Sequence, residues 1–167
     1  MVKLAWFLPL LILLFTLPLI FSQSKSLQTQ PQLLKSFKIK SPKVTSTCSY
    51  TVTIKTSCSS PSYTRDKVSL AFGDAYGNEV YAAKLDDPRS RTFERCSTDT
   101  FKISGPCMYK ICYVYMLRRG SDGWKPESVK IYAPNSKAVS FTYNTFLPNG
   151  VWYGFKVCNG DLAISVS

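Results

Sequence analysis

The residues of this sequence with the most distinctive chemistry are six cysteines, which all lie between Cys48 and Cys158. The sequence has no histidine, so it lacks the commonest general base and a common metal ligand. Zinc and haem sites are therefore disfavoured, and disulfide bonds are the simplest use of the cysteines. We predict a disulfide-bonded protein that folds in an oxidising compartment and is not an enzyme.

Other catalytic arrangements have little support in the sequence. There is no Gly-x-Ser-x-Gly motif, and the stretch Gly120-Ser-Asp-Gly123 is too short to form one. A pair of carboxylates could act on a sugar, because a glycosidase needs only two acids in a cleft. The acids of this chain lie in turns beside arginines, so ion pairing explains them more simply. A small carboxylate-dependent hydrolase is the least favoured of three functional hypotheses.

The N-terminus has the pattern of a secretory signal peptide. A short positive start precedes an apolar run over residues 4–21, and small residues follow it. A transmembrane anchor is the alternative, which Pro18 at the end of the run disfavours. We assign residues 1–23 to the signal peptide and residues 24–46 to a Lys/Ser/Pro-rich linker without regular structure.

Positive charge is concentrated in this linker. The full chain carries a formal net charge of +11, and five of its lysines, with no acid among them, lie between residues 25 and 45. A spacer is the simpler interpretation of such a tail, and a propeptide or surface-binding arm is the less favoured, more specific alternative. The lysines elsewhere are scattered, so we expect no nucleic-acid partner.

Alternation of apolar and polar residues with a period of two predicts β-strands from Ser49 onward. The segment 109–117 is apolar on both faces, which is typical of a central strand. Eight such segments, separated by turn residues, predict an antiparallel sandwich or barrel. The segments lie at residues 50–54, 68–72, 81–85, 101–103, 109–117, 129–131, 139–143 and 151–157.

Four short motifs, in order along the chain, resemble those of PLAT (lipoxygenase-homology) domains. They are Tyr50-Thr-Val-Thr-Ile-Lys-Thr56, Thr64-Arg-Asp66, Phe93-Glu-Arg with Thr98-Asp-Thr-Phe101, and Gly123-Trp124 before a strand. Thr64 and Arg65 depart from the residues usual in that domain. More closely, the chain resembles the plant embryo-specific protein 3 family, which pairs a signal peptide with one such domain.

This resemblance implies an all-β fold, an eight-stranded antiparallel β-sandwich over residues 47–160, followed by a C-terminal tail at 161–167. It also implies a binding role without catalysis, because the PLAT module usually accompanies a separate enzyme domain. On the family pattern, Trp124 is a core residue and not a ligand contact.

Strand alternation predicts that the loops after alternate strands meet at one end of the sandwich. These loops, residues 56–66, 86–99, 118–127 and 144–150, contain every arginine of the sequence. Arginine suits phosphate and carboxylate, and apolar loop residues can enter a lipid interface. The candidate binding surface consists of Tyr63, Arg65, Arg89, Arg91, Arg118, Arg119, Phe146 and Leu147.

The alternative interpretation of these loops is structural. They carry as many acids as basic residues, so salt bridges within the loops would occupy several arginines. In that case Phe146 and Leu147 pack back onto the core.

Four aspartates in the same loops raise the question of calcium, which prefers six to eight oxygen ligands. Some PLAT domains bind calcium at one end, and the resemblance therefore makes Asp66, Asp86, Asp87 and Asp122 candidate ligands. No contiguous spacing like that of an EF-hand is present. We predict no required cofactor and calcium as the one candidate metal.

The predicted topology also constrains the disulfides. Cys58 and Cys96 fall in loops at the arginine-containing end, so we favour a bridge between them. The remaining cysteines, at or nearer the other end, form two further bridges in one of three arrangements. They are Cys48, Cys107, Cys112 and Cys158.

Together these features support a secreted, extracellular protein of the plant apoplast or cell wall, with a seed, embryo or stress context taken from the resemblance. The first hypothesis is a non-catalytic module that recognises lipid or membrane surfaces or a membrane-associated partner. The second is a wall-associated adaptor that binds an extracellular protein or an acidic polysaccharide. The oligomeric state is not predicted.

Overall fold

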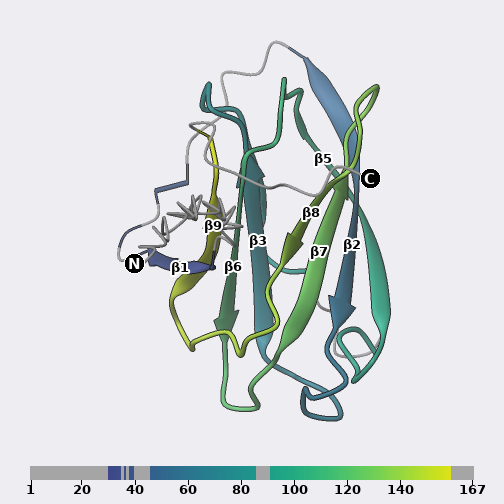
Figure 1. Ribbon diagram of the computed structural model, residues 1–167, viewed down its shortest axis with the longest axis vertical. Helices are drawn as coiled ribbons and strands as arrows, with labels where there is room; N and C mark the ends of the chain where they lie inside the picture. The colour runs from purple at the N-terminus through teal and green to yellow at the C-terminus, as the bar shows by residue number, and fades with distance from the viewer. Residues whose placement is uncertain (1–29, 35, 37, 40–45, 86–90, 159–167) are drawn as a thin grey trace, which may run out of the picture.

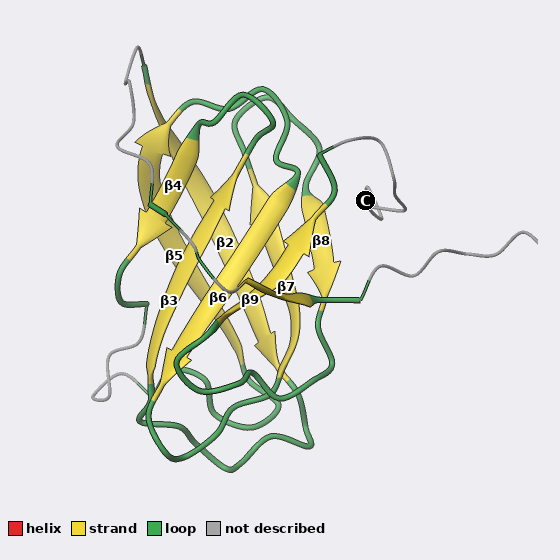
Figure 2. Ribbon diagram, turned by 90° about the vertical axis from the view of Figure 1, so that its left-hand side faces the viewer, coloured by secondary structure: helices red, strands yellow, loops and turns green. Residues whose placement is uncertain are grey.

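The computed structural model describes residues 30–34, 36, 38–39, 46–85 and 91–158. In this part of the chain, two antiparallel sheets face each other, as Figures 1 and 2 show from two sides. The predicted all-β sandwich is therefore confirmed. No helix among the described residues is long and apolar enough to cross a membrane. The predicted signal peptide and C-terminal tail lie outside the described residues.

The sandwich contains nine strands in the described residues. The five-stranded sheet has the order β1-β9-β6-β3-β4, and the four-stranded sheet has the order β5-β2-β7-β8. The bounds are β1 Gln32–Leu34, β2 Thr47–Thr56, β3 Lys67–Gly73, β4 Glu79–Ala82, β5 Thr98–Pro106, β6 Tyr113–Arg119, β7 Pro126–Tyr132, β8 Val139–Thr142 and β9 Trp152–Lys156.

Strand β1 departs from the sequence prediction, which placed residues 24–46 in a linker without regular structure. Gln32 to Leu34 instead pair antiparallel with β9, Leu34 lying opposite Trp152. Leu34 packs against an apolar cluster that contains Tyr113 and Tyr115. An open edge of β9 and a nearby apolar surface together explain why a short stretch of linker becomes a strand.

The core lies between the sheets and follows the alternation seen in the sequence. Val52 and Ile54 of β2, and Leu70 of β3, point inward and are fully buried. Strand β6 is covered on both faces, as predicted for a central strand, but it begins at Tyr113 and not at residue 109. Residues 109–112 instead belong to a loop.

The loops gather at two ends of the sandwich. We call the lower end in Figure 1, with loops 57–66, 91–97, 120–125 and 143–151, the arginine end. At this end Arg95 N–H donates to the Ser62 carbonyl at 3.1 Å, and Leu147 N–H donates to the Trp124 carbonyl at 3.0 Å. The predicted meeting of these loops is therefore confirmed.

We call the opposite end, with loops 74–78, 107–112 and 133–138, the tyrosine end. Two of the three disulfides lie at or near this end. They join Cys48 to Cys107 and Cys112 to Cys158, with Cα–Cα distances of 4.9 and 4.8 Å. The third joins Cys58 to Cys96 at the arginine end, with a Cα–Cα distance of 4.4 Å. Loop 107–112 thus begins and ends at a disulfide-bonded cysteine.

A substitution at Gly154 would test how closely β9 packs against the rest of the sandwich. A Cβ atom at this position would overlap the Val114 carbonyl oxygen and lie 2.9 Å from the Tyr143 hydroxyl. We expect Gly154→Ala to lower the free energy of unfolding by about 1–3 kcal/mol, because backbone atoms must move to admit the methyl group. Guanidinium unfolding with the disulfides intact measures this loss.

Ser104→Ala, an equally small change at an exposed position of β5, is the matched control and should leave the unfolding midpoint unchanged. A Gly154→Ala variant as stable as wild type would contradict the close packing of β9 on β6.

Candidate functional site

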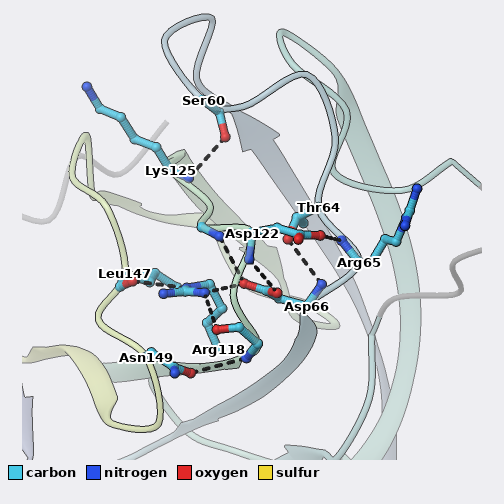
Figure 3. A network of polar contacts seen from close by, with 11 residues as sticks. Ser60, Thr64, Arg65, Asp66, Arg118, Asp122, Lys125, Leu147 and Asn149 are labelled. Atoms are coloured by element: carbon cyan, nitrogen blue, oxygen red, sulfur yellow. Dashed lines mark hydrogen bonds and ion pairs between the residues drawn. The ribbon is translucent and has the colours of Figure 1, made fainter.

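A buried ion pair organises the arginine end. Asp66, which immediately precedes β3, and Arg118 of β6 are 3% and 7% exposed. The Arg118 Nη1 donates to Asp66 Oδ2, and its Nε donates to the Leu147 carbonyl at 3.1 Å. Figure 3 shows the pair at the meeting point of the loops. The pair therefore ties the β2–β3 loop to the β8–β9 loop.

Asp66 also holds the β6–β7 loop. Its carboxylate accepts the backbone N–H groups of Asp122 at 3.0 Å and Gly123 at 3.1 Å. A side chain at Gly120 would overlap Asp66 Oδ1, so glycine is needed there for this close approach. The polar network thus links three of the loops at this end.

The surroundings of Asp66 keep it ionised. Burial alone would raise the pKa of this carboxyl. Three groups outweigh this effect of burial and hold the pKa of Asp66 below its usual range: the backbone N–H of Asp122, the Arg118 guanidinium and the backbone N–H of Gly123. A charged Asp66 is therefore the form that matches its partners.

Two residues of the predicted binding surface are not at the surface. Arg118 is occupied by Asp66 and by backbone carbonyls, and Leu147 is 2% exposed within the core. Arg118 lies two residues after Met116 on the inward face of β6, which explains its direction. Leu147 packs into the core, whereas the adjacent Phe146 is exposed. For these two residues the structural interpretation of the loops is therefore correct: Arg118 forms a salt bridge, and Leu147 packs onto the core.

The other arginines of the described residues differ in their contacts. Arg95 donates through Nε to the Ser60 carbonyl at 2.8 Å and so supports the β2–β3 loop. Arg65, Arg91 and Arg119 have exposed side chains. Arg89 lies outside the described residues.

Two cation–aromatic pairs stand at the surface of the arginine end. The Tyr63 and Phe146 side chains are each 53% exposed. The Arg65 guanidinium lies 5.1 Å from the centre of the Tyr63 ring, and Lys125 Nζ lies 5.9 Å from the centre of the Phe146 ring. Lys125 was not among the residues predicted for this surface, although it follows the Gly123-Trp124 motif directly.

The ion-pair network positions both of these pairs. Arg65 N–H donates to Asp122 Oδ2 at 2.8 Å, which connects the first pair to the loop that Asp66 holds. Phe146 precedes Leu147, whose N–H binds the Trp124 carbonyl, and Lys125 follows Trp124. The predicted core role of Trp124 agrees with its complete burial and its contact with Phe93.

Two of the four predicted calcium ligands, Asp66 and Asp122, have protein partners in the described part of the chain. The Asp66 carboxylate is surrounded by N–H donors and a guanidinium, and Asp122 Oδ2 accepts an N–H bond. Calcium requires six to eight oxygen ligands, and no group of three acidic, cysteine or histidine residues suited to a metal occurs in the described residues. Asp86 and Asp87 lie outside the described residues.

Comparison with known proteins gives a consistent family. The model of the family described as Embryo-specific protein 3 (ATS3) matches residues 35–158. Embryo-specific protein ATS3A of Arabidopsis thaliana is 64% identical over 144 residues, which are 84% of this chain and 80% of the relative.

Solved structures give the fold. A LOX variant (Delta413-417:GS I805A) has a TM-score of 0.57 and 19% identity, and the match covers 66% of this chain but 17% of the other. Coral 8R-lipoxygenase, described with calcium activation through a C2-like domain, has a TM-score of 0.56 and 18% identity over 65% of this chain and 17% of its own. At these identities the likeness concerns the fold alone.

The ion pair makes a prediction about stability. Asp66→Asn keeps the volume of the side chain but leaves Arg118 buried beside a neutral group. We expect a loss of about 3–5 kcal/mol in the free energy of unfolding at pH 7, measured by guanidinium unfolding. Asp122→Asn, which keeps an acceptor at an exposed position, should change stability by less than about 0.5 kcal/mol.

The same pair fixes the pH dependence. Because the pKa of Asp66 is lowered in the folded state, its contribution is complete above the unfolded value of about 3.9. The contribution is lost as the pH falls through the lower folded value. The stability gap between wild type and Asp66→Asn should therefore narrow only below about pH 4. A gap that closes near neutral pH would rule out the ionised pair.

Proposed function

This chain belongs to the embryo-specific protein 3 family, and we propose that it is a secreted, non-catalytic module that binds lipid or membrane surfaces. Membership confirms the resemblance inferred from the sequence motifs. The relatives' name supports a plant embryo or seed as its setting. The PLAT-like fold supports a binding role, because this fold presents loops on a rigid sandwich.

The observation that carries the proposal is the presence of two exposed cation–aromatic pairs at one end. Tyrosine rings lie at the level of lipid headgroups, phenylalanine rings enter the apolar boundary beneath them, and neighbouring cations interact with phosphates. Tyr63 with Arg65 and Phe146 with Lys125 combine these features on loops that the buried ion pair holds in place. Arg91 and Arg119 add exposed positive charge at this end.

Secretion is supported by the predicted signal peptide and by the three disulfides, which suit an oxidising compartment. The proposal of a non-catalytic role rests on the absence of histidine and on the use of Asp66 as a structural ion-pair partner. We propose that neither calcium nor another cofactor is needed for lipid binding.

A vesicle sedimentation assay tests the proposal. Wild type should pellet with vesicles that contain phosphatidylcholine and phosphatidylglycerol at about 0.15 M salt, equally with added calcium or with EGTA. The double variant Tyr63→Ser/Phe146→Ser should bind at least about tenfold more weakly, because burying each ring contributes about 1.5–3 kcal/mol.

Tyr132→Ser is the matched control, since Tyr132 is an exposed aromatic residue on β7 and is stacked with Lys130. It should bind vesicles as wild type does. Equal binding by the double variant would refute the role of the arginine end. Pelleting only at low salt, and lost on deleting residues 25–45, would favour the adaptor that binds acidic polysaccharide.

A further inference from the structure

We propose that the tyrosine end binds a neutral oligosaccharide, in a cavity on the outer side of the five-stranded sheet and on two exposed tyrosines of the loops that meet at Asp74. The cavity has a volume of about 460 Å³, within the range of about 300–1,000 Å³ that is common for ligand pockets. It lies at the opposite end from the cation–aromatic pairs and does not depend on the lipid-binding proposal.

The floor of the cavity is built from one row of residues across the sheet. Gly73 of β3 pairs with both Glu79 of β4 and Tyr113 of β6, and Tyr113 pairs with Lys156 of β9. A Cβ atom at Gly73 would overlap the Tyr113 hydroxyl, so the glycine allows the tyrosine to lie across β3. The Tyr113 hydroxyl then donates to Glu79 Oε2 at 2.8 Å.

The remaining walls come from two segments that are far apart in the sequence. Asp74 and Ala75 of the β3–β4 turn form one wall, and Leu34 and Lys38 of the N-terminal segment form another. Figure 2 faces this outer side of the sheet, with β3, β4 and β6 in front. Burial, followed by the hydrogen bond to Glu79, raises the pKa of Tyr113, so its hydroxyl stays protonated.

Two highly exposed aromatic rings lie on loops that meet at Asp74, a residue of the cavity lining. Tyr76 follows Ala75 directly and is 79% exposed, and Tyr109 of loop 107–112 is 83% exposed. The centres of the two rings are 6.3 Å apart, and the ring planes are nearly perpendicular. Such a pair forms a corner that offers one ring face and one ring edge to a ligand.

A buried carboxylate fixes this corner. Asp74 is 3% exposed and accepts the backbone N–H groups of Tyr76 at 2.9 Å, Asn78 at 3.0 Å and Tyr109 at 3.3 Å. It also accepts the Asn78 side-chain amide at 2.8 Å. These hydrogen bonds order two loops whose tyrosine rings bury little area themselves. Such loops are already fixed before a ligand binds, as in a preformed binding site.

The charges of the lining select the class of ligand. Two carboxylates, Asp74 and Glu79, and two lysines, Lys38 and Lys156, balance each other. An anion would face the carboxylates, a cation would face the lysines, and an alkyl chain would desolvate both. A neutral sugar avoids these costs, because it carries no charge, its hydroxyls accept from the ammonium groups, and its apolar ring face packs on tyrosine.

Isothermal titration of the full secreted chain with cellohexaose, a xyloglucan heptasaccharide and mannohexaose tests the proposal, with an oligogalacturonide as the acidic comparison. We expect saturable binding of at least one neutral oligosaccharide, with an affinity that high salt does not change. Tyr76→Ala/Tyr109→Ala should bind at least about tenfold more weakly, because exposed aromatic anchors carry much of such an affinity.

Two further variants separate ligand contact from loop structure. Tyr76→Phe/Tyr109→Phe keeps both rings and should retain most of the affinity. The vesicle-binding variant Tyr63→Ser/Phe146→Ser should bind the oligosaccharide as wild type does, since it changes the opposite end. If none of the neutral oligosaccharides binds, if only the oligogalacturonide binds, or if the double alanine variant keeps its affinity, the proposal is overturned.

Discussion

The geometry of the arginine end depends on the buried ion pair between Asp66 and Arg118. Charges are costly to remove from water, and a buried pair is tolerated only when its remaining donors and acceptors are also satisfied. Here the backbone N–H groups of Asp122 and Gly123 and the carbonyl of Leu147 meet that requirement. The loops that supply them are therefore fixed together, and the surface side chains they carry keep their relative positions.

The two ends of the sandwich use the same device with different results. Asp66 and Asp74 are both buried carboxylates that accept at least two backbone N–H groups each, those of Asp66 from the β6–β7 loop alone and those of Asp74 from two loops. Asp66 has a guanidinium partner that reaches a further loop. Asp74 is held by N–H donors of the β3–β4 turn and the β5–β6 loop. Both carboxylates fix loops that carry exposed aromatic residues. At the arginine end cations lie over the rings, and at the tyrosine end two tyrosine rings contact each other.

Much of this fold could be predicted because the strands obey simple alternation. Eight strands and the meeting of four loops followed from it, and they also placed Cys58 near Cys96. Strand β1 could not be found this way, since three residues carry no period and their partner is distant in sequence. Alternation did contain one unused signal: Arg118 continues the inward series of Val114 and Met116.

The candidate sites were less predictable than the fold. Nothing in the pair Phe146-Leu147 indicates which side chain points outward, because that depends on the loop packed beneath it. The corner formed by Tyr76 and Tyr109 joins loops 33 residues apart through Asp74, and it emerges only when β3 and β6 are paired. Family resemblance pointed to calcium, whereas the contacts of Asp66 are those of a structural carboxylate.

The disulfides at the tyrosine end have a consequence for the loop between them. Cys107 and Cys112 close loop 107–112 at both ends, through bonds to Cys48 and Cys158. Much of the conformational entropy of this loop is therefore removed once, when the bridges form, and is not lost again with each molecule that Tyr109 meets. In a reducing compartment the same loop would regain that freedom. The shape of this end is thus a property of the oxidised chain.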